Sequence, residues 1–204
     1  MYIAIINYNM GNIKSVENAF KIIGAQVKVT SSPSVIRKAE AVVLPGVGAF
    51  QDAVNNLKQL KLYDSVIEVT GSGKPFLGIC IGLQVLFEYG KEGGISDGLG
   101  IFKGSVERIL PGVKIPHMGW NKIKIAKVKS LLFKDIKDGE SFYFVHSYHV
   151  VCDDESLVSS LTEYGVNIVS SIEYKNIYGL QFHPEKSSRS GLQILKNFAS
   201  IAGM

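Results

Sequence analysis

Short apolar runs alternate with amphipathic helical stretches over residues 1–80, and this alternation limits the possible folds more than any other feature. Apolar runs at residues 2–6, 26–30, 41–44 and 76–79 have the length and composition of buried strands. The segments between them are long enough to form helices. A strand–helix–strand order predicts a mainly parallel sheet with helices on both faces, which is an α/β three-layer sandwich.

Helical periodicity supports this prediction. After the first apolar run, Ile13, Val16, Phe20 and Ile23 recur at helical spacing, and Gly24 fits a helix terminus. Residues 50–70 are expected to be largely helical, with a break near residues 61–62. In sheets of this kind the ligand crevice lies beyond the carboxyl ends of the strands.

The second half of the chain has a different pattern, with short strands and turns from about residue 103 onward. We expect these strands to be antiparallel additions to the core sheet, at residues 106–109, 122–125, 142–145, 157–161 and 168–172. Residues 191–201 are expected to form a closing helix. The sequence contains no repeat, low-complexity segment or linker, so residues 1–204 are interpreted as one domain.

A cysteine stands at the most informative junction, in Gly78-Ile79-Cys80-Ile81-Gly82. It lies between the apolar run that ends at residue 79 and a predicted helix at residues 83–87. A nucleophile on such a sharp strand-to-helix turn is exposed to a pocket, and the flanking glycines allow the strand and helix backbones to approach closely. The amino end of the helix would also favour a thiolate. The alternative is a buried structural cysteine between two packing glycines.

A histidine and a carboxylate follow another predicted strand, in Gln181-Phe182-His183-Pro184-Glu185. In an extended chain, residues two apart point to the same side, so His183 and Glu185 are expected to project together. The carboxylate could orient the imidazole, and the imidazole could take the thiol proton of Cys80. Taken singly, His183 is interpreted as a satisfied surface histidine and Glu185 as a solvated charge.

Composition excludes several classes of function. The net charge of +4 comes without a dense basic run, so nucleic-acid binding is not indicated, and no apolar run has the length of a membrane span. Residues 1–7 are interpreted as a first strand rather than as a signal segment. The only cysteines are Cys80 and Cys152, which are too few for a disulfide framework. A nucleophilic thiol requires a reducing compartment, so we expect a cytoplasmic protein.

The sequence predicts neither a metal nor a cofactor. The four histidines are scattered without ligand spacing, and neither a phosphate loop nor a dinucleotide fingerprint is present. His146 and His149 lie in one predicted strand and would point to opposite faces. Cys152 is interpreted as a buried structural thiol.

Together these motifs resemble those of the class I (triad-type) glutamine amidotransferases, which have a flavodoxin-like fold. Within that class they are similar to the glutaminase subunits of imidazole glycerol phosphate synthases. The resemblance runs almost from end to end and rests on six segments: Asn7-Tyr8-Asn9-Met10-Gly11-Asn12, Leu44-Pro45-Gly46-Val47-Gly48-Ala49-Phe50, Gly78-Ile79-Cys80-Ile81-Gly82-Leu83-Gln84, His117-Met118-Gly119-Trp120-Asn121, Phe144-Val145-His146-Ser147-Tyr148 and Gln181-Phe182-His183-Pro184-Glu185-Lys186-Ser187.

The resemblance implies a glutaminase reaction at Cys80. The thiolate would attack the side-chain amide of L-glutamine to form a thioester and release ammonia, with His183 as acid and base and Glu185 as its orienter. Oxyanion donors would be the N–H groups of Ile81 and Val47. The resemblance also implies that the loop carrying Val47 must first reorient, which Gly46 and Gly48 make sterically possible. The alternative for this loop is an ordinary strand-end turn.

The resemblance further implies which residues hold glutamine. Gln84 lies one turn after Cys80 and would reach back into its pocket, although alone it would be interpreted as an exposed helix residue. Ser147 and Tyr148 match the segment that binds the amino-acid end of glutamine. Glu92 matches a less well-defined contributor to the same site.

A partner subunit is also implied. Trp120, Asn121, Tyr143 and Lys186 match a surface that meets a (β/α)8-barrel cyclase, although Trp120, in a glycine-rich turn, would alone be interpreted as core. The cyclase would use the ammonia to make imidazole glycerol phosphate and an aminoimidazole carboxamide ribotide. Alternatives are an amidotransferase subunit of a surface-sugar-modifying synthase, the glutaminase of vitamin B6 synthesis, whose oxyanion segment is usually rich in Gly-Gly, and a binding module that has lost catalysis.

Overall fold

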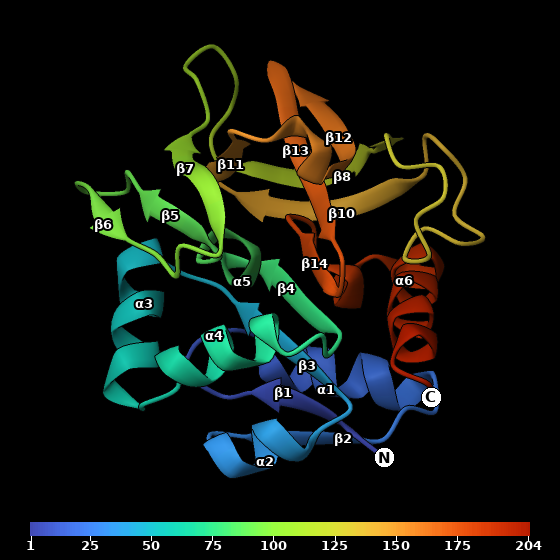
Figure 1. The fold of residues 1–204 in the computed structure, drawn as a ribbon. Helices are drawn as coiled ribbons and strands as arrows, with labels where there is room; N and C mark the ends of the chain where they lie inside the picture. The colour runs from blue at the N-terminus through green and yellow to red at the C-terminus, as the bar shows by residue number, and fades with distance from the viewer.

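The computed structural model describes all residues, 1–204, and its centre is an eight-stranded sheet (Figure 1). The strand order is β2-β1-β3-β4-β14-β13-β12-β9. The first five of these strands are mutually parallel: β2 (Val27–Thr30), β1 (Ile3–Ile6), β3 (Ala41–Gly46), β4 (Phe76–Cys80) and β14 (Ile177–Leu180). The other three add in antiparallel fashion: β13 (Val166–Tyr174), β12 (Val158–Tyr164) and β9 (Lys124–Ile125).

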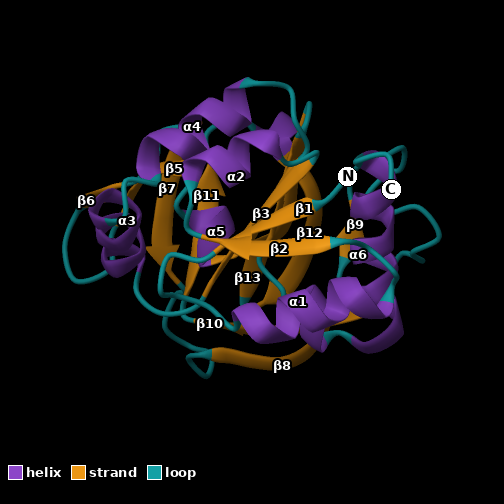
Figure 2. Cartoon of the chain, turned by 90° about the horizontal axis from the view of Figure 1, so that it is seen from below, coloured by secondary structure: helices purple, strands orange, loops and turns teal.

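Helices cover both faces of the parallel part (Figure 2). On one face lie α1 (Ile13–Ile22) and α6 (Ser188–Ile201), and on the other lie α2 (Pro33–Lys38) and α4 (Tyr63–Gly71), with α3 (Phe50–Gln59) beside α4. Phe198 of α6 makes edge contacts with Phe20 of α1 and Tyr178 of β14, at ring-centroid distances of 6.4 and 6.1 Å. The predicted three-layer sandwich and the break between α3 and α4 are confirmed. Helix α2 was not predicted.

Burial explains why the middle strands are apolar throughout. Every residue of β3 and of β4 is buried, as expected for parallel strands with a helical layer on each face. These strands belong to one hydrophobic cluster of 51 buried residues. No helix has both the length and the apolar character that a membrane crossing requires.

The second half contains two further sheets. One has four strands in the order β11-β7-β5-β6: β11 (Tyr148–Cys152), β7 (Phe102–Arg108), β5 (Phe87–Gly90) and β6 (Ser96–Asp97). The other is a ribbon of β8 (His117–Lys122) and β10 (Ser141–His146), called here the β8–β10 ribbon. Two short 3-10 helices, η1 (Glu155–Leu157) and η2 (Pro184–Lys186), complete the chain.

Several predictions about this half are wrong. Residues 106–109 and 142–145 do not join the core sheet, because β7 pairs with β11 and β5, and β10 pairs only with β8. Residues 122–125 are divided between β8 and β9. Strand β10 ends at His146 and β11 begins at Tyr148, so His146 and His149 lie in different strands rather than in one. Trp120 lies within β8 and not in a turn.

Two helix boundaries also differ from the prediction. The helix after Cys80 is only α5 (Ile81–Gln84), and Phe87 begins a strand. The carbonyl of Val85 accepts a bond from Leu99, and that of Leu86 accepts from Ile101 and Phe102, so this backbone pairs with a distant segment. Helix α6 begins at Ser188, three residues before the predicted start.

Candidate active site

The strand-to-helix turn at Cys80 has the geometry of a nucleophile elbow. Cys80 has φ 55° and ψ −109°, a left-handed conformation that costs free energy in a non-glycine residue. A Cβ on Gly78 would overlap the backbone of Gly82, and a Cβ on Gly82 would overlap the carbonyl oxygen of Leu44. The turn therefore depends on both glycines, and it fixes Cys80 at the carboxyl end of β4.

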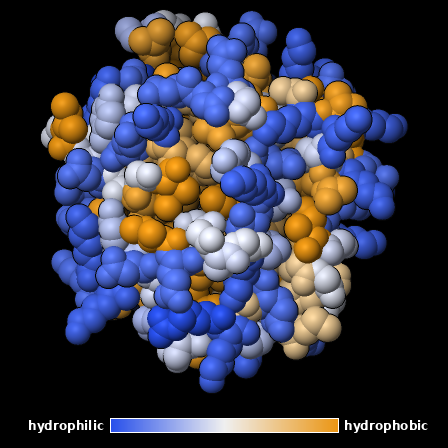
Figure 3. Space-filling view, in the orientation of Figure 1, coloured by the Kyte–Doolittle hydropathy of each residue, from blue (hydrophilic) through white to orange (hydrophobic).

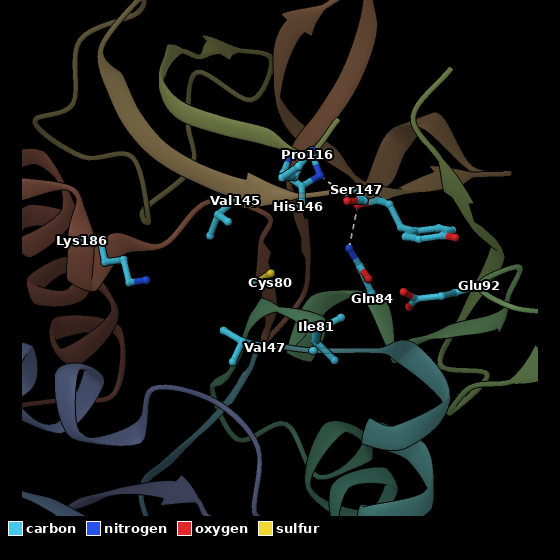
Figure 4. A pocket seen from close by; sticks show the side chains of 12 residues that line it. Val47, Cys80, Ile81, Gln84, Glu92, Pro116, Val145, His146, Ser147 and Lys186 are labelled. Atoms are coloured by element: carbon cyan, nitrogen blue, oxygen red, sulfur yellow. Dashed lines mark hydrogen bonds between the residues drawn. The ribbon is translucent and has the colours of Figure 1, made fainter. Parts of the chain in front are cut away.

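A pocket of about 410 Å³ lies at this end of the sheet, between the central strands and the β8–β10 ribbon (Figure 4). It brings together residues from distant parts of the sequence. Its lining is formed by Val47, Gly48, Cys80, Ile81, Gln84, Glu92, Pro116, Val145, His146, Ser147, Tyr148 and Lys186. Cys80, the oxyanion candidates Val47 and Ile81, and all four glutamine-binding candidates therefore share one pocket.

His183 and Glu185 form a buried pair behind Cys80. His183 Nδ1 lies 2.8 Å from Glu185 Oε1, and the two side chains are 2% and 1% exposed. The prediction that they project together is confirmed, but the backbone is not extended, because η2 begins at Pro184. A carboxylate oxygen accepts, so Nδ1 of His183 donates and Nε2 carries the free lone pair in the neutral ring.

Electrostatics favour the protonated form of His183. Burial disfavours the charged imidazolium, but the neighbouring Cys80 and Glu185 outweigh it and raise the pKa of His183 to about 10. Nε2 is buried without a hydrogen-bond partner, and Cys80 is the neighbouring acid. The arrangement suits proton transfer from a thiol to Nε2 and storage of the proton as an imidazolium.

The β8–β10 ribbon also fixes the backbone of His183. The His183 N–H donates to the carbonyl of Tyr143 at 2.9 Å. The Ser187 hydroxyl donates to the His183 carbonyl at 2.6 Å and accepts from the Tyr143 N–H at 2.9 Å. The position of His183 is thus set by strand β10 as well as by β14.

Two glutamine side chains connect the pocket to the thiol. Gln84 Nε2 donates to the Tyr148 carbonyl at 2.8 Å (dashed in Figure 4) and to Gln181 Oε1 at 3.0 Å. Gln181 Nε2 in turn lies 3.7 Å from Cys80 Sγ. Gln84 is buried, so reading it alone as an exposed residue is wrong. Sequence reasoning missed Gln181, although it stands two residues before His183 in a segment that carries the resemblance.

The loop after β3 packs against Cys80. Gly46 pairs in register with Cys80, and Gly48 has φ +113°, which an ordinary side chain rarely adopts. A Cβ on Gly46 would overlap the Tyr8 hydroxyl and approach Ile81. That hydroxyl is buried without a partner, and burial, with the nearby Cys80, raises the pKa of Tyr8. Tyr8 was not singled out from the sequence.

The remaining glutamine-binding candidates lie around the pocket mouth. Ser147 and Tyr148 occupy the junction between β10 and β11. Glu92 Oε2 accepts the N–H of Phe50 at 2.9 Å, at the start of α3, so one of its oxygens has a structural partner. None of these residues forms part of a metal site, because no group of three or more His, Cys, Asp or Glu side chains is arranged to hold an ion.

Three of the four predicted interface residues form a cluster at the rim. The Trp120 and Tyr143 rings meet edge-on at a centroid distance of 6.2 Å, and Lys186 Nζ lies 5.8 Å from the Tyr143 centroid. Trp120 is 54% exposed, so the core interpretation of this residue is wrong. Asn121 is half-buried and donates to the Glu163 carbonyl at 2.9 Å.

The second cysteine has a different environment. Cys152 is only partly buried, at the end of β11, and lies outside the pocket of Cys80. Burial, with the nearby Asp154 and Asp153, raises the pKa of Cys152 to about 12. Its thiol is therefore protonated at neutral pH and poorly reactive.

The chain matches the family model "Glutamine amidotransferase class-I" over residues 4–202, and it belongs to that family. Curated proteins similar to it carry the name "Imidazole glycerol phosphate synthase subunit HisH". The protein from Moorella thermoacetica is 49% identical over 98% of this chain and 94% of its own length. Those from Caldanaerobacter subterraneus and Aquifex aeolicus are 48% and 49% identical and cover 98% and 97% of this chain and 98% and 96% of their own lengths.

Solved structures show the same fold at low sequence identity. A structure described as a glutamine amidotransferase superimposes with a TM-score of 0.78 at 16% identity and covers all of both chains. The structure of PurLQS from Thermotoga maritima gives 0.78 at 18% identity, over 98% of each chain. The α/β fold with a mostly parallel sheet is therefore the fold of class I amidotransferases.

Proposed function

We propose that this chain is the glutaminase subunit of an imidazole glycerol phosphate synthase. It is a glutamine-hydrolysing enzyme subunit of the class I family, and its relatives named as synthase subunits align with it almost from end to end. The proposal depends most on one observation. Cys80 lies in the pocket, on the turn between β4 and α5, next to the hydrogen-bonded pair of His183 and Glu185. We infer one amidotransferase domain over residues 1–204.

The proposed reaction begins with transfer of the Cys80 proton to His183 Nε2. The thiolate attacks the amide carbon of glutamine, and a tetrahedral intermediate forms with its negative charge on oxygen. The imidazolium then gives its proton to the leaving nitrogen, which departs as ammonia and leaves a glutamyl thioester. Water, deprotonated by His183, hydrolyses the thioester to glutamate. Glu185 keeps the Nδ1–H of His183 oriented and stabilises its charge.

The oxyanion would be held by the N–H groups of Ile81 and Val47. Ile81 directly follows the nucleophile and opens α5, so its N–H has no helical acceptor. Rotation of the Gly46–Val47 peptide would bring the second donor inward, and Gly46 and Gly48 carry no Cβ to oppose it. Gln84, Ser147, Tyr148 and Glu92 would hold the amino-acid end of glutamine.

We assign the partner as a (β/α)8-barrel cyclase that receives the ammonia. Ammonia released into water is protonated and lost, so the mouth of the pocket must be sealed by the subunit that uses it. Lys186 lines the pocket and lies 5.8 Å from the Tyr143 ring centroid, and Tyr143 in turn contacts Trp120, which is 54% exposed on β8 beside the 61% exposed Met118. Aromatic residues of this kind are enriched in protein interfaces. Figure 3 shows the other face of the molecule, that of α4 and β7, which is mostly hydrophilic with hydrophobic side chains near its middle.

The products would be glutamate here and imidazole glycerol phosphate with an aminoimidazole carboxamide ribotide at the cyclase. We place the complex in the cytoplasm, since both cysteines are free and the proposed nucleophile must stay reduced. The sugar-modifying alternative gains no support, because the relatives reported above carry the synthase-subunit name.

The proposed function is tested by substitution of the candidate nucleophile, Cys80. Cys80→Ala should lower glutamine hydrolysis in the complex by roughly 10³-fold or more, because no other thiol lines the pocket. Synthesis by the partner from added ammonium should continue at the wild-type rate. Glutamate release and imidazole glycerol phosphate formation are measured in parallel.

Cys152→Ala is the matched control and should leave both rates unchanged, since Cys152 lies outside the pocket. Glutamine hydrolysis that survives Cys80→Ala would contradict the assignment of the nucleophile. Loss of the ammonium-dependent reaction would contradict the division of labour between the two subunits.

A further inference from the structure

Two buried histidines, one of which lines the pocket, have no part among the proposed reacting atoms. His117 begins β8, His146 ends β10, and the two are register partners across the β8–β10 ribbon. Their exposed fractions are 2% and 6%. His117 Nδ1 lies 2.9 Å from His146 Nε2. The proposed reaction leaves this pair without a role.

The direction of every hydrogen bond in the pair follows from one backbone carbonyl. His146 Nδ1 lies 2.9 Å from the Tyr148 oxygen, which can only accept, so Nδ1 carries the proton. His146 Nε2 is then the acceptor in the neutral ring, and His117 Nδ1 donates to it. His117 Nε2 in turn accepts from Asn121 Nδ2 at 3.3 Å. All four ring nitrogens are paired.

Both rings must be neutral for this pattern to hold. Burial lowers the pKa of His117 to about 4 and that of His146 to about 3, so neither carries a charge at neutral pH. The His117 ring is also stacked between Phe144 and Tyr164, at centroid distances of 4.7 and 3.9 Å. Stacking on both faces fixes the plane in which its nitrogens can reach a partner.

The chain of bonds continues to the candidate nucleophile. The Tyr148 carbonyl accepts from both His146 Nδ1 and Gln84 Nε2. Gln84 also donates to Gln181, whose amide lies against Cys80 Sγ. The carbonyl fixes the Gln84 amide by its nitrogen, and Oε1 of Gln84, a residue of the pocket lining, is left buried and without a partner.

The other end of this series of hydrogen bonds lies in β8, the strand that carries Met118 and Trp120. Side chains alternate along β8, so His117 and Asn121 face inward while Met118 and Trp120 face out. A displacement of β8 by a protein that docks on Met118 and Trp120 would therefore move His117. Strand β10 is coupled in the same way, since Tyr143 faces the rim and His146 faces inward.

We propose that the His117–His146 pair positions the Tyr148 carbonyl, and through it Gln84, for glutamine binding, and that it links this geometry to the position of the β8–β10 ribbon. Both histidines are positioning residues, since neither is placed against the reacting atoms. The inference rests on the proposed function and on the partner face named there. Docking of the partner would then affect the glutamine pocket through a defined series of hydrogen bonds.

His117→Phe tests the pair directly. Phenylalanine keeps the stack between Phe144 and Tyr164 but removes the donor to His146 Nε2. In the complex with the partner, the KM for glutamine should rise about fivefold, the effect expected for one lost hydrogen bond, with a smaller change in kcat. The ratio of glutamine hydrolysis with and without the partner should also fall.

Two further variants keep the test sharp. His117→Asn retains an amide N–H near the Nδ1 position and should recover most of the wild-type KM, which a general packing defect would not allow. His149→Phe changes a neighbouring buried histidine that lies outside the bond chain, and it should leave the KM within twofold of wild type. If His117→Phe fails to fold, Asn121→Ala is used instead. It removes the bond from Asn121 to His117 Nε2 and should also raise the KM.

Equal KM values and equal partner activation in wild type, His117→Phe and His149→Phe would overturn the inference and leave the proposed function intact. Two results would overturn both the inference and the proposed function. One is a wild-type complex that does not hydrolyse glutamine, and the other is a Cys80→Ala complex that hydrolyses it as fast as wild type. Double-mutant analysis gives an independent check: Asn121→Ala should add little to the KM of His117→Phe, because both break the same chain. Fully additive effects would contradict a shared route.

Discussion

In the proposed reaction His183 makes two proton transfers, and its surroundings suit both. Its Nδ1 is committed to Glu185 at 2.8 Å, and its Nε2 is buried, unpaired and adjacent to Cys80. The raised pKa means that the imidazolium is favoured once the thiol proton has arrived. The backbone bonds to Tyr143 and Ser187 hold the ring where that transfer is possible.

Glu185→Gln should remove most of this preparation. Loss of the carboxylate charge lowers the pKa of His183, because the imidazolium loses its closest counter-charge. We expect kcat for glutamine hydrolysis to fall by about 10²-fold or more, with a smaller change in KM. Steady-state kinetics in the complex measure both constants, and an unchanged kcat would contradict the role of Glu185.

The same substitution has a consequence for stability. The pKa of His183 is higher in the folded state than in the unfolded state, so protonation adds stability that is fully present below the unfolded value of about 6.5. That contribution is lost as the pH rises toward about 10. In Glu185→Gln the fall in unfolding free energy over this range should be shallower than in wild type, as followed by denaturant titration.

At the scale of elements, the elbow between β4 and α5 is set by backbone contact. Gly78 and Gly82 let the helix approach β3 and β4 so closely that Cys80 is forced to φ 55°. The free energy stored in this conformation is balanced by the buried packing of β3 and β4 on both faces. The elbow is therefore as sensitive to a methyl group as any position in the core.

Gly82→Ala tests this contact against a helical control. Its Cβ would overlap the Leu44 carbonyl oxygen, so we expect a loss of about 1–3 kcal/mol in unfolding free energy or failure to fold. Gly71→Ala, at the end of α4 with no atom within 4 Å of the new Cβ, should gain up to about 1 kcal/mol. Equal effects of the two substitutions on denaturant midpoints would show that the elbow is not tightly packed.

Elements with a strong local pattern could be predicted from the sequence, and those set by distant pairing could not. The parallel strands and α1, α3 and α4 follow from continuous apolar runs and helical periodicity. Helix α5 is short because residues 85–87 bond to residues 99–102, which no local pattern indicates. The β8–β10 ribbon is separate from the core sheet for the same reason.

The candidate site divides in the same way. Cys80, His183 and Glu185 stand in short segments whose spacing already indicates their chemistry. The His117–His146 pair joins residues 29 apart in sequence through a strand register, and the bond from Gln181 to Cys80 spans 101 residues. No local sequence pattern indicates the contact between the two histidines or the contact between Gln181 and Cys80.

At the scale of the whole molecule, Lys186 connects the pocket lining to the aromatic pair of Trp120 and Tyr143. A hydrolase that acted alone would have no need of an aromatic rim around its product. In the proposed function, ammonia made at Cys80 therefore passes to the partner without mixing with the solvent. The assignment of the docking face depends on this transfer.

Isotope tracing measures that transfer most directly. The wild-type complex is given glutamine labelled at its amide nitrogen, the substrate of the cyclase and a moderate excess of unlabelled ammonium, and the imidazole product is analysed by mass spectrometry. We predict that almost all of the product carries the label, because the nitrogen never enters the bulk solution. Product whose labelling matches that of the bulk ammonium would contradict the account.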